Sequence, residues 1–140
     1  MSSDVSFPAD GEALAEGGVE QFVASLAPAL QVLGVTVSAT TLSSGDNGTY
    51  VVAIDGVVVR LYDASSWESK VESELPWYAS TMKPLAVVNG LLKAAGAKER
   101  CFVLYPGGNE GVVLLIDPRI VAAVQAAGLA EGNELPVEAV

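Results

Sequence analysis

Histidine is absent from this sequence of 140 residues, and cysteine occurs once, at Cys101. Without an imidazole the chain cannot build a Ser-His-Asp or Cys-His catalytic site, nor any metal site that includes histidine. A lone cysteine cannot form an intramolecular disulfide, and the apolar run that Cys101 begins predicts a buried, structural thiol with a raised pKa. The sequence therefore predicts no catalytic residue, no metal site and no cofactor.

Basic residues are also few, because seven lysines and arginines stand against 17 acidic residues, for a net charge of −10. Binding of nucleic acid needs a cluster of basic side chains that neutralises phosphates, and the sequence has none. The acids concentrate at the two ends: residues 1–20 hold five and residues 129–140 hold three, without a base in either segment. We expect a nearly neutral folded part and no nucleic-acid partner.

Long hydrophobic runs are missing, although 51% of the residues are hydrophobic and the mean hydropathy is +0.42. The longest apolar runs, such as 112–116, have about five residues, far below the roughly 20 of a membrane-spanning helix. Residues 1–10 lack the basic and apolar regions of a secretory signal. We expect a soluble cytoplasmic protein without membrane contact. We also expect a single domain at 11–129, with a flexible N-terminal segment at 1–10 and a flexible acidic tail at 130–140.

The first half of the chain changes from a helical to an alternating pattern. Apolar residues at helical spacing follow Asp10, a candidate N-cap, and end at Gly34, with a break expected at Gly17-Gly18 or at Pro28. Period-two alternation then predicts three strands, at 35–42, 49–55 and 57–63. The connections are a loop at 43–48 and the pair Asp55-Gly56, which suits a type I′ hairpin.

The second half predicts helices on either side of two apolar strands. Trp67, Val71 and Leu75 have the spacing of a short helix that Pro76 would end, and a further helix follows Pro84 and ends at Gly96. Strands 101–105 and 112–116 are apolar at nearly every position, as in strands covered on both faces. Asp117-Pro118 begins the last helix, and Gly128 and Leu129 suit its Schellman end.

The expected fold is α+β, with a mainly antiparallel five-stranded sheet in the order helix, three strands, helix, two strands, helix.

The segment PGGNEG, residues 106–111, lies between the last two predicted strands. A glycine loop that holds a phosphate leads into a helix N-terminus, whose N–H groups and dipole attract the anion. This segment leads into a strand, and Glu110 would repel a phosphate. We favour a hairpin turn, with a ligand contact by Asn109 or Glu110 as the alternative.

Two features are candidates for binding a protein partner. Glu12, Glu16 and Glu20 follow one another at four-residue spacing, so they form either a solvated helix face or an acidic docking stripe. Trp67, Trp77 and Tyr78 are aromatic residues of the types enriched in binding hot spots, although filling of the core is the alternative. We prefer a surface role for Trp77 over Trp67, because Pro76 would leave Trp77 and Tyr78 on irregular backbone, whereas Trp67 shares an apolar helical stripe with Val71 and Leu75.

An enzyme that uses carboxylates alone is the competing function. Asp55, Asp63, Glu110 and Asp117 are the candidates for an acidic cluster. The sequence also predicts local roles for three of them, because Asp55 belongs to a turn, Asp63 ends a strand and Asp117 caps a helix.

The order of three helices and five strands over residues 19–128 resembles that of the class I chaperones of type III secretion. The resemblance implies a homodimer that wraps an unfolded effector segment, although segment 64–83, the short last helix and the tail depart from it. The stretch VVNGLLKAAGAKERCFVLYPGGNEGVVLLIDP, residues 87–118, is similar in style to small acidic bacterial immunity-type proteins encoded beside toxins. We expect a non-catalytic protein-binding module whose partner is a toxin or an effector, with immunity or inhibition ranked first and the homodimeric chaperone second.

Overall fold

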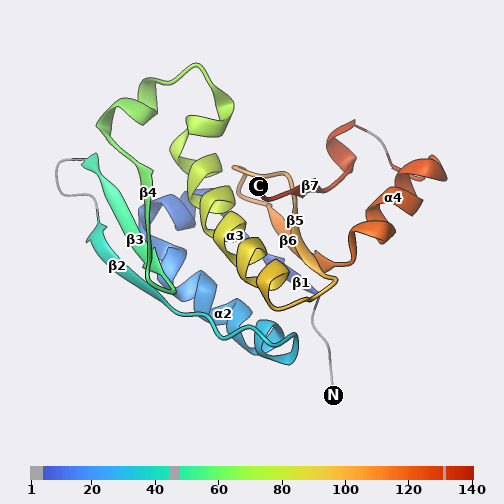
Figure 1. The fold of residues 1–140 in the computed structure, drawn as a ribbon. Helices are drawn as coiled ribbons and strands as arrows, with labels where there is room; N and C mark the ends of the chain where they lie inside the picture. The colour runs from blue at the N-terminus through green and yellow to red at the C-terminus, as the bar shows by residue number, and fades with distance from the viewer. Residues whose placement is uncertain (1–4, 45–47, 131) are drawn as a thin grey trace.

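The computed structural model of the protein describes residues 5–44, 48–130 and 132–140 (Figure 1). The loop expected at 43–48, and the flanking segments 1–10 and 130–140, each include residues outside these ranges.

Within the described residues, the strands form two antiparallel sheets. The three-stranded sheet has the order β2 (Ala39–Ser44), β3 (Tyr50–Ile54) and β4 (Val57–Tyr62). The four-stranded sheet has the order β1 (Ser6–Pro8), β6 (Val112–Ile116), β5 (Arg100–Leu104) and β7 (Val137–Glu138).

The expected α+β class with antiparallel pairing is confirmed, but the single five-stranded sheet is wrong. Alternation of apolar and polar residues identifies strands without saying which of them pair, and here the first three pair only among themselves. Strands β1 and β7, of three and two residues, are too short to produce a recognisable alternation. They lie within the segments 1–10 and 130–140.

The helical region after Asp10 is broken at one of the two places expected. The carboxylate of Asp10 caps α1 (Gly11–Ala13) by accepting hydrogen bonds from the N–H groups of Glu12 and Ala13. A π-helical turn at Leu14–Gly18 follows, in which Gly17 has a φ of 109°, and α2 (Val19–Val32) then runs through Pro28. The break therefore lies at the glycine pair.

The expected helix that ends at Pro76 is wrong. Segment 64–75 instead contains two short 3₁₀ turns, Ala64–Glu68 and Glu72–Glu74, and Pro76 begins α3 (Pro76–Ala94). A proline at the first helical position forfeits no hydrogen bond, because that N–H has no partner within the helix. Helix α3 also continues through Pro84, so Trp77 and Tyr78 lie in its first turn and not on irregular backbone.

Three local predictions are confirmed. Asp55 and Gly56 have φ angles of 50° and 81°, as a type I′ turn requires, and β3 pairs with β4 around them. The carboxylate of Asp117 accepts from the N–H of Arg119 and caps α4 (Pro118–Ala126). At the other end of α4, the N–H of Leu129 donates to the carbonyl oxygen of Val124 across 3.2 Å.

Helix α3 lies between the two sheets, in contact with β4 on one side and β5 on the other, and α2 packs against β2 and α3 (Figure 1). One hydrophobic core contains buried side chains from α2, α3 and both sheets. Helix α4 contributes no buried residue. None of the described helices is both long and apolar enough to cross a membrane.

Candidate partner-binding site

A pocket of about 240 Å³ lies where segment 64–78 meets the hairpin loop between β5 and β6. Eight residues line it: Trp67, Glu72, Leu75, Pro76, Trp77, Tyr78, Pro106 and Gly107. They come from the two 3₁₀ turns, the first turn of α3 and the hairpin loop. The three aromatic residues that the sequence singles out therefore share one pocket.

Local hydrogen bonds order the 3₁₀ turn that carries Trp67. The carboxylate of Asp63 accepts from the N–H of Ser65 at 2.9 Å, and the hydroxyl of Ser66 accepts from the N–H of Asp63 at 3.0 Å. The Asp63 side chain also accepts from the backbone of Ser66, so Asp63 and Ser66 form a capping box. The hydrogen bond from the Ser65 hydroxyl, followed by that from its N–H, lowers the pKa of the Asp63 carboxyl. The sequence placed Asp63 at the end of a strand, and the structure adds its role as a cap.

Trp67 is 54% exposed, but one side of its ring is supported by a row of aromatic rings. The ring of Tyr62 meets Trp67 edge to face with centroids 5.6 Å apart, and Tyr50 meets Tyr62 in the same manner at 5.7 Å. Such pairs contribute about 0.5–1.5 kcal/mol beyond the area that they bury. The indole of Trp67 is thus held in place while much of it stays open to a partner. The expected preference for Trp77 over Trp67 at the surface is wrong, because Trp67 lies in an exposed 3₁₀ turn and Trp77 is half-buried in the first turn of α3.

The same two tyrosines complete the π-helical turn of the first helical region. The hydroxyl of Tyr62 donates to the carbonyl oxygen of Ala15 at 2.7 Å, and the hydroxyl of Tyr50 accepts from the N–H of Val19 at 3.2 Å. Burial raises the pKa of both tyrosines above the ordinary value of 10.0. The kink at Gly17 and the wall of the pocket are therefore connected through side chains of β3 and β4.

The hairpin loop forms the opposite wall of the pocket through a close backbone approach. Gly107 has a φ of 83°, and a Cβ at this position would lie 3.3 Å from the Cα of Tyr78. The N–H of Gly11 donates to the carbonyl oxygen of Gly108 at 2.9 Å, which ties the loop to the start of α1. The hairpin-turn interpretation of PGGNEG is confirmed by the pairing of β5 with β6.

The structure places Asn109 and Glu110 outside the pocket lining. The side-chain amide of Asn109 donates to the carboxylates of Asp10 at 3.1 Å and Glu12 at 3.3 Å, so it joins the loop to the cap of the first helix. Glu110 is exposed. Sequence reasoning missed the contribution of the loop to the pocket, which comes from Pro106 and Gly107.

Glu12, Glu16 and Glu20 do not line the pocket. Glu16 lies within the π-helical turn that separates Glu12 from Glu20, so their four-residue spacing does not lie on one continuous α-helix. Glu12 contacts Asn109, and the carboxylate of Glu20 accepts from the N–H of Thr41 at 2.8 Å, where it occupies a donor on the edge strand β2. Glu16 is exposed, and its negative charge adds to the effect of burial in raising the pKa of Tyr62.

The candidate carboxylates of an enzyme site have separate positions in the fold. Asp55 lies in the β3–β4 turn, Asp63 caps a 3₁₀ turn, Glu110 lies in the hairpin loop and Asp117 caps α4. Among residues 5–44, 48–130 and 132–140, no three histidine, cysteine, aspartate or glutamate side chains are grouped so that they could hold a metal ion. Cys101 is buried, and burial raises its pKa to about 12.

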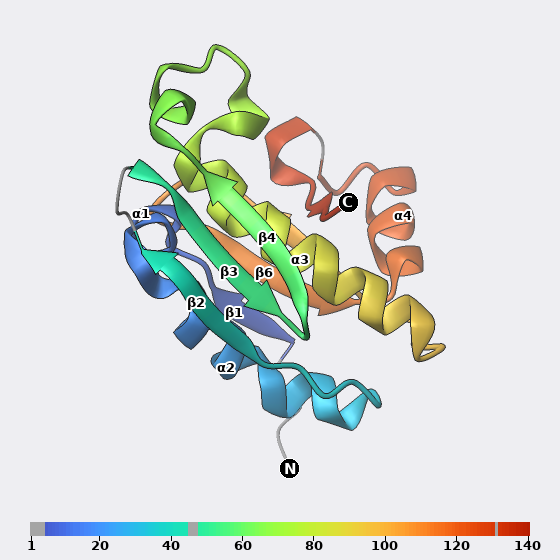
Figure 2. The same cartoon turned by 60° about the vertical axis from the view of Figure 1, so that its left-hand side comes forward.

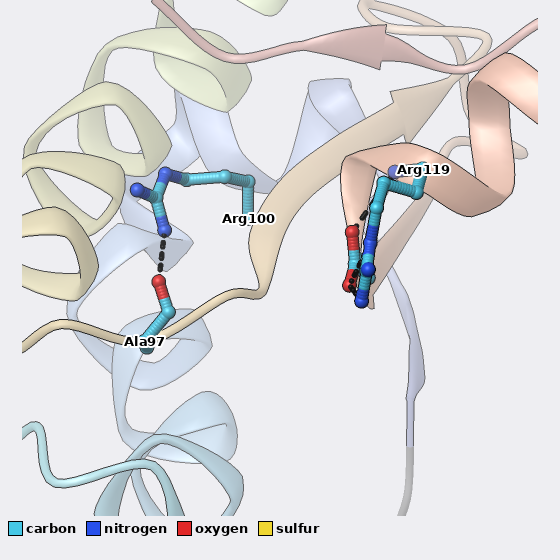
Figure 3. Close-up of polar contacts among 4 residues, drawn as sticks. Ala97, Arg100 and Arg119 are labelled. Atoms are coloured by element: carbon cyan, nitrogen blue, oxygen red, sulfur yellow. Dashed lines mark hydrogen bonds and ion pairs between the residues drawn. The ribbon is translucent and has the colours of Figure 1, made fainter.

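Two arginines lie at the end of the β5–β6 hairpin opposite the pocket loop (Figure 3). The guanidinium of Arg100 donates to the carbonyl oxygens of Ala97 at 2.8 Å and Glu99 at 2.6 Å. Arg119 pairs with Asp117 at 2.6 Å, and this hydrogen bond holds the pKa of the Asp117 carboxyl below its usual range. Arg100 thus binds backbone carbonyl groups at the start of β5. Arg119 binds the carboxylate that caps α4.

Comparisons of the chain with protein-family models, with curated proteins and with solved structures found no match.

Proposed function

We propose that this protein is a non-catalytic protein-binding module of the immunity or inhibitor kind, which recognises its partner through the pocket lined by Trp67, Trp77 and Tyr78. The observation that carries the proposal is the meeting of these three side chains in one pocket. Tryptophan and tyrosine dominate the binding energy of protein interfaces when they lie around a pocket that a partner side chain can fill.

The size of the pocket favours a side chain of a partner over a cofactor. Its volume of about 240 Å³ falls below the roughly 300–1,000 Å³ of pockets that enclose drug-sized molecules. A pocket of this size accommodates one side chain from a protein that covers the surrounding surface.

The walls of the pocket are held in place before any partner binds. The capping box of Asp63 orders the turn of Trp67, Pro76 begins a regular helix, and Gly107 packs against the backbone of Tyr78. Preorganised groups lose less conformational entropy on association, which leaves more of the contact energy for affinity. The net charge of −10 would in addition accelerate encounter with a basic partner.

A selection experiment tests the proposal. Random peptides displayed on phage are enriched on the immobilised wild-type protein, and the affinities of the enriched peptides are then measured. We expect Trp67→Ala to weaken them by about 2 kcal/mol, which is roughly 30-fold. The matched control is Val32→Ala on α2, which truncates another exposed apolar side chain outside the pocket and should change the affinities less than about twofold. Equal affinity for Trp67→Ala and wild type, or no enrichment of any peptide, would overturn the proposal.

Trp77→Ala tests the other aromatic wall. Trp77 is half-buried in the first turn of α3, so the free energy of unfolding is measured beside the affinity. A loss of about 2 kcal/mol in binding with a smaller loss in stability assigns it to the partner surface. A loss of about 3–5 kcal/mol in stability without a separate effect on binding assigns it to the core.

A homodimeric chaperone is the second candidate, and the three-stranded sheet is the observation that favours it. Leu42, Val57 and Val58 are 55%, 47% and 66% exposed. Figure 2 shows this sheet in front, with no helix of the described residues over its forward face. Sedimentation at micromolar concentration separates the two candidates, because the chaperone requires a stable dimer in the absence of its partner and the inhibitor does not.

A further inference from the structure

The charge that borders the aromatic pocket is negative. Of the eight lining residues, seven are aromatic, apolar or glycine, and the eighth is the carboxylate-bearing Glu72. The two segments that build the pocket, 64–78 and 105–111, contain Glu68, Glu72, Glu74 and Glu110 against a single base, Lys70. We infer that the side chain bound by the pocket is cationic, and that it is an arginine of the partner protein. This inference rests on the proposed function, since it specifies the partner of the same pocket.

The aromatic walls supply the first part of the argument. The faces of tryptophan and tyrosine carry a negative electrostatic potential and attract ammonium and guanidinium groups within about 6 Å, with tryptophan the strongest. Two tryptophans and one tyrosine line the pocket. A neutral aliphatic side chain would gain only burial from these rings, whereas a cation gains burial of its stem and attraction to the rings.

Glu72 supplies the second part, because a carboxylate in the wall of an apolar pocket discriminates by charge. It would attract a cation, contribute little to a neutral side chain and repel an acidic one. Glu74 lies in the same 3₁₀ turn, but its carboxylate accepts a hydrogen bond from the hydroxyl of Ser69 at 2.8 Å and it does not line the pocket. The two glutamates thus form a matched pair for testing.

Arginine satisfies this lining better than lysine. Its planar guanidinium stacks on an indole face and still presents N–H donors in its plane, which a carboxylate accepts in pairs. The ammonium of lysine is more strongly hydrated and makes no such planar contact. Glu72 and the indoles therefore act together on one guanidinium.

The two tryptophans of the protein both line the pocket, so their indole N–H signals report on it selectively. In the ¹⁵N-labelled full-length protein, the two indole signals are followed during titration with N-acetylarginine amide, N-acetylcitrulline amide and N-acetylleucine amide. Citrulline has nearly the shape of arginine but no charge. We expect arginine amide to move the indole signals saturably and to bind at least about fivefold more tightly than citrulline amide.

Two variants test whether Glu72 produces the preference for arginine amide over citrulline amide. In Glu72→Gln the preference for arginine over citrulline should fall to less than about twofold, whereas in the control Glu74→Gln it should stay within about twofold of the wild-type value. Binding of citrulline or leucine amide that equals or exceeds that of arginine amide would overturn the inference and leave the proposed function standing. A preference unchanged by Glu72→Gln, or indole signals that no probe moves, would overturn it as well. The peptide selection with Trp67→Ala judges the proposed function independently of these titrations.

Discussion

Replacement of Tyr50 by phenylalanine removes one hydroxyl from the place where the three-stranded sheet supports the kinked helical region. Tyr50 is 1% exposed, and its hydroxyl accepts a hydrogen bond from the N–H of Val19, the first residue of α2. This hydrogen bond lies at the junction between the π-helical turn and α2, so the tyrosine hydroxyl fixes the start of α2 against β3. Phenylalanine keeps the ring that packs on Tyr62 and removes the buried hydrogen bond to the N–H of Val19.

The expected loss follows from the removal of that acceptor. A buried N–H that loses a hydrogen-bond acceptor costs about 1–3 kcal/mol, a substantial part of the roughly 5–15 kcal/mol by which a domain is stable. We expect a decrease of about 2 kcal/mol in the free energy of unfolding. For a chain of this length such a decrease lowers the Tm by roughly 6–8 °C.

Urea denaturation followed by far-ultraviolet circular dichroism measures this loss. The control is Tyr62→Phe, which removes the hydroxyl that donates to the carbonyl oxygen of Ala15 and should cost less, about 0.5–1.5 kcal/mol. The two losses should not add in the double variant, because both hydroxyls serve the same turn. A loss below about 0.5 kcal/mol for Tyr50→Phe, at an unchanged denaturant slope, would refute the role assigned to this hydroxyl.

Three further perturbations probe the pocket loop, the thiol and the alkaline range. Gly107→Ala should lower stability by about 1–3 kcal/mol and move both indole signals, because its φ of 83° strains a residue with a Cβ and the 3.3 Å approach requires Tyr78 to shift. Gly128→Ala, at a φ of 68° with open space, should lose less and leave the indoles unmoved. Cys101, whose pKa burial raises to about 12, should react with a thiol-specific disulfide reagent at pH 8 only after unfolding, so rapid reaction of the native protein would contradict its burial. Burial also raises the pKa of Tyr50 in the folded state above 10.0, so its contribution is fully present below pH 10 and is lost as the pH rises further. Unfolding measured at pH 9 and pH 11 should show a smaller alkaline loss in Tyr50→Phe than in wild type, and an equal loss would argue against this assignment.

Signals that act within a few residues were sufficient to predict local structure. Asp117-Pro118 predicts the start of α4 because a carboxylate can cap the first N–H groups and a proline N needs no partner there. The pair Asp55-Gly56 predicts its hairpin in the same way, since both residues tolerate positive φ. Pro76 shows the limit of such signals, because a proline is equally compatible with the end of one helix and the first position of the next.

The tertiary structure decided which strands share a sheet and which residues share the pocket. Period-two alternation marks a strand but carries no information on its neighbour, so nothing in the sequence separated β2–β4 from the sheet of β5 and β6. The pocket joins Trp67 and Trp77 to Pro106 and Gly107, which lie 29 to 40 positions later in the chain. A contact over that separation depends on how α3 lies against the β5–β6 hairpin. The sequence by itself determined that the aromatic residues were available, whereas packing between elements determined that they face one cavity beside a single carboxylate.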